Sequence, residues 1–253
     1  MSIELALTPD SRWGLDASVL AALARETGFS AVSLGVRQAD EDAAASLAVN
    51  RVRCHELLAF VLGRNDEANL RHAQELAEAA DAVRAEWVLT TFAVPITRDS
   101  ARAIARFAAM FAEAGAKMAA EFSPLGGVTS IPAALAVVEA AGFDRAGVLI
   151  DSWHFFRGDS TWENLETVPL ERLAYVQFDD ALEPVSDDAL DETMNRRVMP
   201  GDGIFDLERF TSTLLDRGWE GLVSVEVLSD DLRRLSIPEF ARIAYEKTTR
   251  YWR

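Results

Sequence analysis

Eight short apolar runs recur about every thirty residues along this chain, and their spacing is the feature that most limits its fold. Alanine-rich segments with helical spacing separate the runs. Such an alternation of strand-like and helix-like segments is typical of repeated βα units with a parallel sheet. The eight predicted strands cover residues 3–7, 31–36, 51–60, 86–92, 116–122, 146–151, 173–178 and 221–228.

The helical segments complete this pattern. Ser130 and Pro132 mark the start of one predicted helix, because serine caps helices and proline suits a first turn. Eight strands with helices between them in 253 residues favour a closed (β/α)8 TIM barrel of the α/β class, as one domain over residues 1–253. A doubly wound open sheet is the alternative, but it normally does not need eight strands at so regular a spacing. Helices are predicted over 66–84, 97–115, 131–142, 205–217 and 238–250.

The charge balance argues against a nucleic-acid partner. The net charge at pH 7 is −16, whereas nucleic-acid binding draws its affinity mainly from clustered Lys and Arg. No stretch approaches the roughly 18 consecutive apolar residues of a membrane span. Residues 1–14 lack the basic start and the cleavage site of a signal peptide. We therefore expect a cytoplasmic protein that binds neither nucleic acid nor membrane.

Cysteine and histidine are scarce, which limits the kinds of metal site. The single cysteine, Cys54, excludes an internal disulfide and any thiolate-rich zinc or iron–sulfur site. The chain has three histidines, His55, His72 and His154, too few for a multi-zinc site built on imidazole.

Polar side chains stand at the ends of four consecutive predicted strands. They are Glu121, Asp151, Gln177 and Glu226. Because side chains alternate along a strand, each of them can project into the barrel mouth while its apolar neighbours pack outward. Taken singly, each is more often a salt-bridge partner, but four on consecutive strands favour a shared site on the catalytic face of a barrel.

This set of side chains predicts a divalent metal. Ionised carboxylates that converge in a poorly hydrated place need cations or protons, because their desolvation is costly. Three carboxylates and one carboxamide oxygen suit Mn²⁺ or Mg²⁺ better than Zn²⁺, and Co²⁺ or Zn²⁺ is the alternative. A long polar connection, residues 179–203, follows the seventh strand on the same face, and loops of this length are usually functional or disordered.

Several motifs of the C-terminal half resemble the sugar phosphate isomerase/epimerase family, the xylose isomerase-like TIM barrels. The motifs are "EFSPLGG" at 121–127, "VLIDSWHFFRG" at 148–158, "YVQFDDA" at 175–181, "RVMPGDG" at 197–203 and "VSVEV" at 223–227. The N-terminal half matches this family only in architecture.

The resemblance implies roles for individual residues. The four metal ligands would be Glu121, Asp151, Gln177 and Glu226. His154, in the D-x-x-H pattern, would contact substrate or support the ligands. Arg197, ahead of the P-G-x-G turn, would bind a substrate oxygen, phosphate or carboxylate, or else lie at the surface. Gln177 departs from the pattern, because many epimerases of the family have His there and 3-dehydroshikimate dehydratases of one branch have Gln.

The implied chemistry is removal of a proton next to a carbonyl, with the metal stabilising the negative charge of an enediolate. For an isomerase or epimerase, Glu121 and Glu226 would act as an acid/base pair on opposite faces of the substrate. For a dehydratase acting on 3-dehydroshikimate or an inosose-like ketone, His154 would protonate the leaving hydroxyl. A barrel that binds a metal or metabolite without catalysis is the third alternative.

Further expectations concern the substrate and possible partners. The substrate would be a small ketose, a sugar phosphate or a cyclic polyol ketone. Glu56 is a further candidate for substrate binding, and His55 is either a functional or a packing residue. The aromatic C-terminal residues 248–253 suggest packing against a second subunit of a homo-oligomer.

Overall fold

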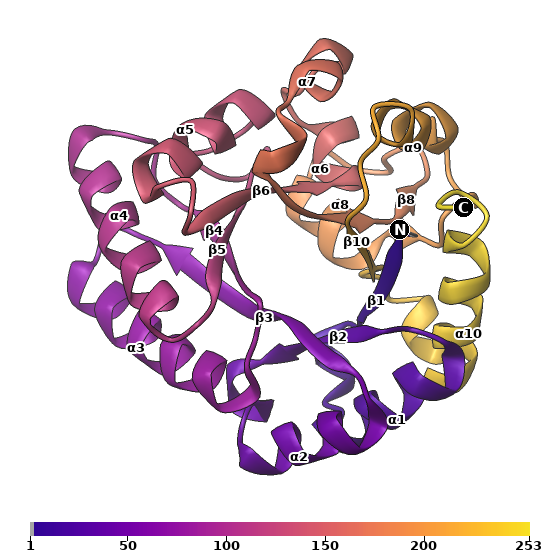
Figure 1. The fold of residues 1–253 in the computed structure, drawn as a ribbon. Coiled ribbons are helices and arrows are strands. Elements are labelled where there is room, and N and C mark those ends of the chain that lie inside the picture. Colours follow the sequence, from indigo (N-terminus) through magenta and orange to yellow (C-terminus); the bar gives the residue numbers. More distant parts are fainter. Residues whose placement is uncertain (1–2) are drawn as a thin grey trace.

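Eight parallel strands form a closed barrel in the computed structural model, which describes residues 3–253 (Figure 1). Around the barrel the order is β1-β10-β7-β6-β5-β4-β3-β2, and the barrel closes where β1 pairs with β10 from Glu4–Leu222 to Thr8–Glu226. The predicted TIM barrel is confirmed, and the open sheet is excluded. The strands are β1 (Glu4–Thr8), β2 (Ala31–Gly35), β3 (Arg53–Leu62), β4 (Trp87–Phe92), β5 (Lys117–Glu121), β6 (Ala146–Asp151), β7 (Leu173–Phe178) and β10 (Leu222–Glu226).

Helices surround the barrel as an outer ring (Figure 1). The five predicted helices are confirmed with small shifts at their ends, and Ser130 caps the helix that it was expected to start, through the amide of Ala133. The helices are α1 (Ala17–Thr27), α2 (Glu41–Asn50), α3 (Asp66–Val83), α4 (Arg98–Glu113), α5 (Ile131–Ala141), α6 (Ser152–Arg157), α7 (Trp162–Thr167), α8 (Ala189–Asn195), α9 (Leu207–Leu215) and α10 (Ile237–Thr248).

The interior of the barrel contains an apolar cluster, and polar side chains follow it at the carboxyl ends of the strands. Leu89, Ala119, Leu149 and Tyr175 form a small apolar cluster inside the barrel, separate from the large core between strands and helices. Side chains alternate along a strand, so the next side chain that points inward comes two residues later. After Ala119, Leu149 and Tyr175 these next side chains are polar, namely Glu121, Asp151 and Gln177. The strand period thus places polar groups at the carboxyl ends of the strands.

A β-bulge on β3 brings two consecutive polar residues into the barrel. The register between β2 and β3 shifts after Val32, so that Ser33 lies opposite Glu56 rather than His55. A bulge interrupts the regular alternation of side chains along a strand. Both His55 and Glu56 are therefore completely buried inside the barrel instead of pointing to opposite faces.

The polar connection after β7 is largely ordered. It contains helix α8 and a short antiparallel ribbon made of β8 (Asp180–Ala181) and β9 (Arg197–Val198). The carboxylate of Asp180 accepts hydrogen bonds from the backbone amides of Gly201, Gly203 and Phe205. The segment 179–203 is thus held against the barrel mouth.

The aromatic C-terminal residues pack on their own barrel. Trp252 is buried, and its ring lies against Phe178 and Trp219 in edge-to-face contacts. The expectation that this tail packs against a second subunit is therefore wrong for Trp252. Among the helices of residues 3–253, none combines the length and the apolar character that crossing a membrane requires.

Candidate active site

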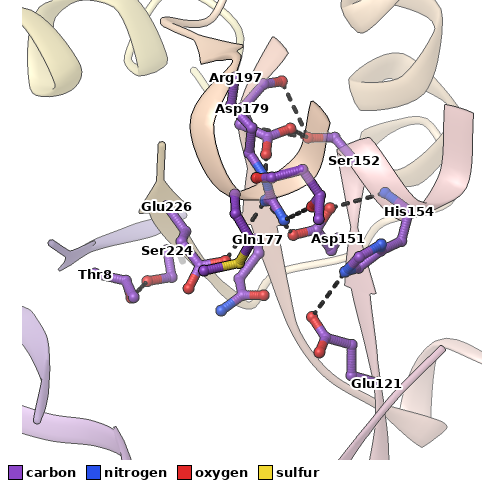
Figure 2. Close-up of polar contacts among 12 residues, drawn as sticks. Thr8, Glu121, Asp151, Ser152, His154, Gln177, Asp179, Arg197, Ser224 and Glu226 are labelled. Atoms are coloured by element: carbon purple, nitrogen blue, oxygen red, sulfur yellow. Dashed lines mark hydrogen bonds and ion pairs between the residues drawn. The ribbon is translucent and has the colours of Figure 1, made fainter. Parts of the chain in front are cut away.

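The four predicted metal ligands lie together at the carboxyl ends of β5, β6, β7 and β10. We call these four side chains, with His154, the strand-end cluster (Figure 2). Gln177 and Asp151 are fully buried, and Glu121, His154 and Glu226 are exposed by 9% or less. Since these four strands are neighbours in the barrel, the fold brings together residues that are more than a hundred positions apart in the chain.

Three members of the cluster have donor atoms close enough to share one ion. One donor atom each of Glu121, Asp151 and His154 lies within 4.8 Å of the other two. His154 Nε2 is 3.5 Å from a carboxylate oxygen of Glu121, and the backbone amide of His154 donates to Asp151 Oδ1 at 2.9 Å. His154 thus joins the carboxylates directly, because Asp151 caps the short helix α6 that begins at the end of its strand.

Gln177 has one side-chain atom with a partner and one without. Its Nε2 lies 3.5 Å from Glu56 Oε2, whereas its Oε1 is buried and has no hydrogen-bond partner. A buried polar atom without a partner costs free energy, so it points to a group that completes the site. An unpartnered carboxamide oxygen and buried carboxylates suit a divalent cation. The donor set therefore fits a divalent metal.

Arg197 is paired with carboxylates and is not free to bind an anion. Its Nη1 donates to Asp151 Oδ2 at 2.8 Å and to Asp179 Oδ2 at 2.5 Å, and lies 3.5 Å from Glu226 Oε2. Its remaining donors bind the backbone and the hydroxyl of Thr193. The guanidinium is 2% exposed. In this structure Arg197 therefore balances the charge of the cluster, and its predicted contact with substrate stays a prediction.

Burial changes the protonation of the two outer carboxylates. The loss of hydration raises the pKa of Glu226 to about 8, although the guanidinium of Arg197 partly offsets this effect. Burial also raises the pKa of Glu121 well above its usual range, and the nearby charges of Asp151 and Glu226 add to this shift. Without a metal, Glu226 therefore holds a proton near neutral pH, and the pKa of Glu121 is shifted in the same direction. A pKa near the working pH suits a general acid or base.

Asp151 and His154 respond in the opposite direction. Burial acts to raise the pKa of Asp151, but the charge of Arg197 and the hydrogen bonds that Asp151 accepts outweigh it and lower the pKa. Burial lowers the pKa of His154 to about 4, against the attraction of Asp151. The site therefore contains an ionised aspartate and a neutral imidazole at physiological pH.

Glu56 lies beneath the cluster and is fully buried. Its carboxylate accepts hydrogen bonds from the hydroxyls of Thr8, at 2.9 Å, and of Ser33 and Tyr175. His55 Nε2 lies 3.0 Å from the hydroxyls of Ser33 and of Ser224 in the same layer. Glu56 is not among the residues that line the cavity above the cluster. Its predicted contact with substrate is thus not seen in the structure, which places it against Gln177.

A cavity of about 560 Å³ opens above the strand-end cluster. Glu121, His154, Arg197 and Glu226 form its polar end. Its other walls come from β3, β4, the loop after β5 and helix α8. This volume is in the usual range of small-molecule pockets.

Two functional residues were missed by the sequence analysis. Asp179 accepts a hydrogen bond from Arg197 Nη1, the nitrogen that also binds Asp151, and its carboxylate accepts a second one from Ser152 at 2.6 Å. Burial raises the pKa of Asp179 to about 8, partly against the charge of Arg197. The acidic pair Asp179 and Asp180, directly after a buried strand, was the available signal. Thr193, which binds Arg197 from α8, had no comparable signal.

Comparisons with known proteins agree with this architecture. A family model described as the xylose isomerase-like TIM barrel matches residues 21–246. The inosose isomerase of Halalkalibacterium halodurans is 32% identical over 136 residues, which cover 53% of this chain and 47% of that protein. The match thus spans about half the length of that relative. The 3-dehydroshikimate dehydratase of Pseudomonas aeruginosa is 31% identical over 97 residues, 38% of this chain and 15% of that protein.

Solved structures are similar over the whole barrel. The IolI protein with a bound zinc atom has a TM-score of 0.83 and 19% identity, and the comparison covers 98% of both chains. D-allulose 3-epimerase from Methylomonas in complex with D-allulose has a TM-score of 0.75 and 16% identity, over 99% of this chain and 98% of the other. At these identities the comparisons establish the fold.

Proposed function

The chain belongs to the xylose isomerase-like TIM barrel family, and we propose that it is a divalent-metal-dependent isomerase or epimerase of small hydroxy-ketones. The observation that carries this proposal is the strand-end cluster, with its buried carboxylates and the unpartnered oxygen of Gln177. The similarity to inosose isomerases supports a hydroxy-ketone as the substrate. The zinc atom bound in the similar IolI structure supports a metal in this protein as well.

In this proposal Glu121, Asp151, Gln177 and Glu226 hold the metal. A bound Mn²⁺ or Mg²⁺ would act as a Lewis acid toward the substrate carbonyl, and Co²⁺ or Zn²⁺ are the alternatives. Glu56 would hold the NH₂ group of Gln177 on its own side, so that Gln177 Oε1 would face the metal. The paired Arg197 would keep Asp151 ionised and fixed in place.

The proton would be moved by the two outer carboxylates. Glu121 and Glu226 border the cavity from strands that lie on either side of Asp151 and Gln177 (Figure 2). One of them, ionised, would take up the proton next to the carbonyl, and the other, protonated, would donate its own proton at the neighbouring carbon or on the opposite face. His154 lies within the same cavity and would donate a hydrogen bond to a substrate hydroxyl, because its ring is neutral.

The test is metal-dependent proton exchange. Protein stripped with a chelator and reloaded with Mn²⁺ is incubated with a panel of ketoses, ketose phosphates and inososes in deuterated water, and exchange is followed by NMR. We expect exchange that requires the metal and that falls by a factor of at least about 10² in Glu121→Gln and in Glu226→Gln. Glu67→Gln, an exposed change on α3, is the matched control. Full exchange in both site variants would exclude this mechanism. Absence of exchange in the metal-loaded wild-type protein would favour a barrel that binds without catalysis.

A dehydratase is the second candidate, because the Pseudomonas 3-dehydroshikimate dehydratase is among the similar proteins and because Gln177 stands where that branch has Gln. In that case one carboxylate would remove the proton and His154 would protonate the leaving hydroxyl. An ultraviolet-absorbing product from 3-dehydroshikimate, formed by the same metal-loaded protein, would decide for this reaction.

A further inference from the structure

We propose that the substrate is an uncharged hydroxy-ketone that carries an apolar substituent, and that this substituent lies on an apolar wall of the cavity above the strand-end cluster. The inference rests on the proposed function and specifies its substrate class. We define the apolar wall by six side chains of the cavity lining: Leu58, Leu89, Phe92, Leu125, Leu190 and Met194.

The charges around the cavity favour an uncharged substrate. Among the described residues that line it, Arg197 is the single Arg or Lys, and its guanidinium is bound to Asp151 and Asp179 and lies near Glu226. A phosphate or carboxylate group is normally recognised by free Arg or Lys donors. Here such a group would meet Glu121 and Glu226 without a free cation from the lining, apart from the metal itself.

A molecule that carries a hydroxyl on every carbon would bury little apolar surface against the apolar wall. Leu125 and Leu190 are 46% and 59% exposed at the mouth of the cavity, and Met194 is 36% exposed. Single exposed Leu residues are ordinary on a protein surface, whereas several around one cavity indicate a binding surface. A substituent that covers them removes apolar area from water, and a hydroxyl-rich ring does not.

The apolar wall and the polar end belong to the same cavity, so one ligand can contact both. Met194 and Leu190 come from α8, the helix whose Thr193 binds Arg197. Leu58 and Leu89 come from β3 and β4, on the side of the barrel next to Glu121. A molecule whose carbonyl end reaches the cluster therefore extends along the wall, so the wall and the cluster act on one ligand.

Hydroxamates test this inference without knowledge of the substrate, because they bind divalent metals through two oxygens as a hydroxy-ketone does. The affinities of acetohydroxamate, benzohydroxamate and phosphoglycolohydroxamate for the Mn²⁺-loaded protein are measured by calorimetry. We expect benzohydroxamate to bind at least about tenfold more tightly than acetohydroxamate, because its ring buries apolar area. The phosphorylated probe is expected to bind no more tightly than acetohydroxamate.

Two sets of variants test whether the higher affinity of benzohydroxamate comes from the apolar wall. The double change Leu190→Ser and Met194→Ser should remove most of the advantage of benzohydroxamate and leave the affinity for acetohydroxamate unchanged. Val49→Ser, at a 76% exposed position of α2, is the matched control and should leave both affinities as they are.

Four results would overturn the inference, and they differ in what else they exclude. Equal affinities of the two uncharged probes, or tightest binding of the phosphorylated probe, would exclude an uncharged substrate with an apolar substituent. Either result would leave the proposed metal site in place. Failure of every hydroxamate to bind the loaded protein removes the proposed function as well. A double variant that changes the sedimenting mass while the probe affinities stay constant assigns the wall to contact with a second copy of the chain.

Discussion

At the scale of single residues, Glu56 determines how the amide of Gln177 is oriented. The carboxylate of Glu56 has only acceptor atoms when ionised, and three hydroxyl groups point at it. The NH₂ group of Gln177 is therefore the part of that side chain that turns toward Glu56, which leaves Gln177 Oε1 available to the proposed metal. Supporting contacts of this kind are part of a metal site, because they fix the direction of the ligand atoms.

Glu56→Gln tests this dependence. The new amide has the same shape, but its NH₂ group competes with the hydroxyl donors and with the amide of Gln177. We expect the affinity for Mn²⁺ to fall by about 10- to 100-fold, measured by calorimetry on chelator-stripped protein. Glu67→Gln, at an exposed position, should leave the affinity unchanged. An unaltered affinity in a folded Glu56→Gln protein would mean that Gln177 is oriented by something else.

At the scale of elements, the loop after β5 packs closely against the end of β4. The amide of Gly127 donates to the carbonyl of Phe92 at 2.6 Å. A Cβ atom at Gly127 would lie 2.1 Å from the carbonyl carbon of Val94, so only glycine allows this approach. The loop carries Leu125 and Val128 of the cavity lining, and its seat therefore shapes the substrate cavity.

Gly127→Ala is expected to push this loop away from β4. We expect a loss of about 1 to 3 kcal/mol in the free energy of unfolding, as in other overpacked sites, together with at least a tenfold loss of kcat/KM. Urea unfolding and the proton-exchange assay measure the two effects. Gly63→Ala is the control, because the nearest heavy atom outside the adjoining residues, Asn69 Oδ1, would lie 3.7 Å from the new Cβ atom. Equal stability of the two variants would contradict the tight seat.

At the scale of the whole molecule, the metal-free protein carries buried acids that keep their protons up to high pH. Burial raises the pKa of both Glu226 and Asp179 to about 8, while the unfolded chain loses these protons near pH 4. The native state therefore holds more protons, and stability falls as pH rises toward 8. His55 and His154 have pKa values near 4, lowered mainly by burial, so their effect is confined to pH below about 6.5.

We therefore expect the metal-free protein to lose stability between pH 6.5 and pH 8. The slope is up to about 1.4 kcal/mol per pH unit for each retained proton, so a decrease of at least about 1 kcal/mol is expected. Urea unfolding in the presence of a chelator measures it. Saturating Mn²⁺ should flatten the dependence, since its ligands are ionised, and Glu226→Gln should reduce it. Constant or rising stability over this window in the metal-free protein would contradict the assigned pKa values.

The sequence by itself determined the strands, the barrel and the four residues at the strand ends. This was possible because these features depend on local periods: side chains alternate along each strand, and parallel strands of a barrel end on one face. The positions of Glu121, Asp151, Gln177 and Glu226 at one mouth of the barrel follow from that rule.

Only the tertiary structure decided what surrounds these residues. Glu56 turns inward because a bulge breaks the alternation of β3, which a period of two does not predict. Arg197 reaches Asp151 across 46 positions of sequence because segment 179–203 folds back over the barrel mouth. The apolar wall joins β3 and β4 to α8. Partners of this kind depend on packing between distant segments, and the periodicity of one segment carries no information about them.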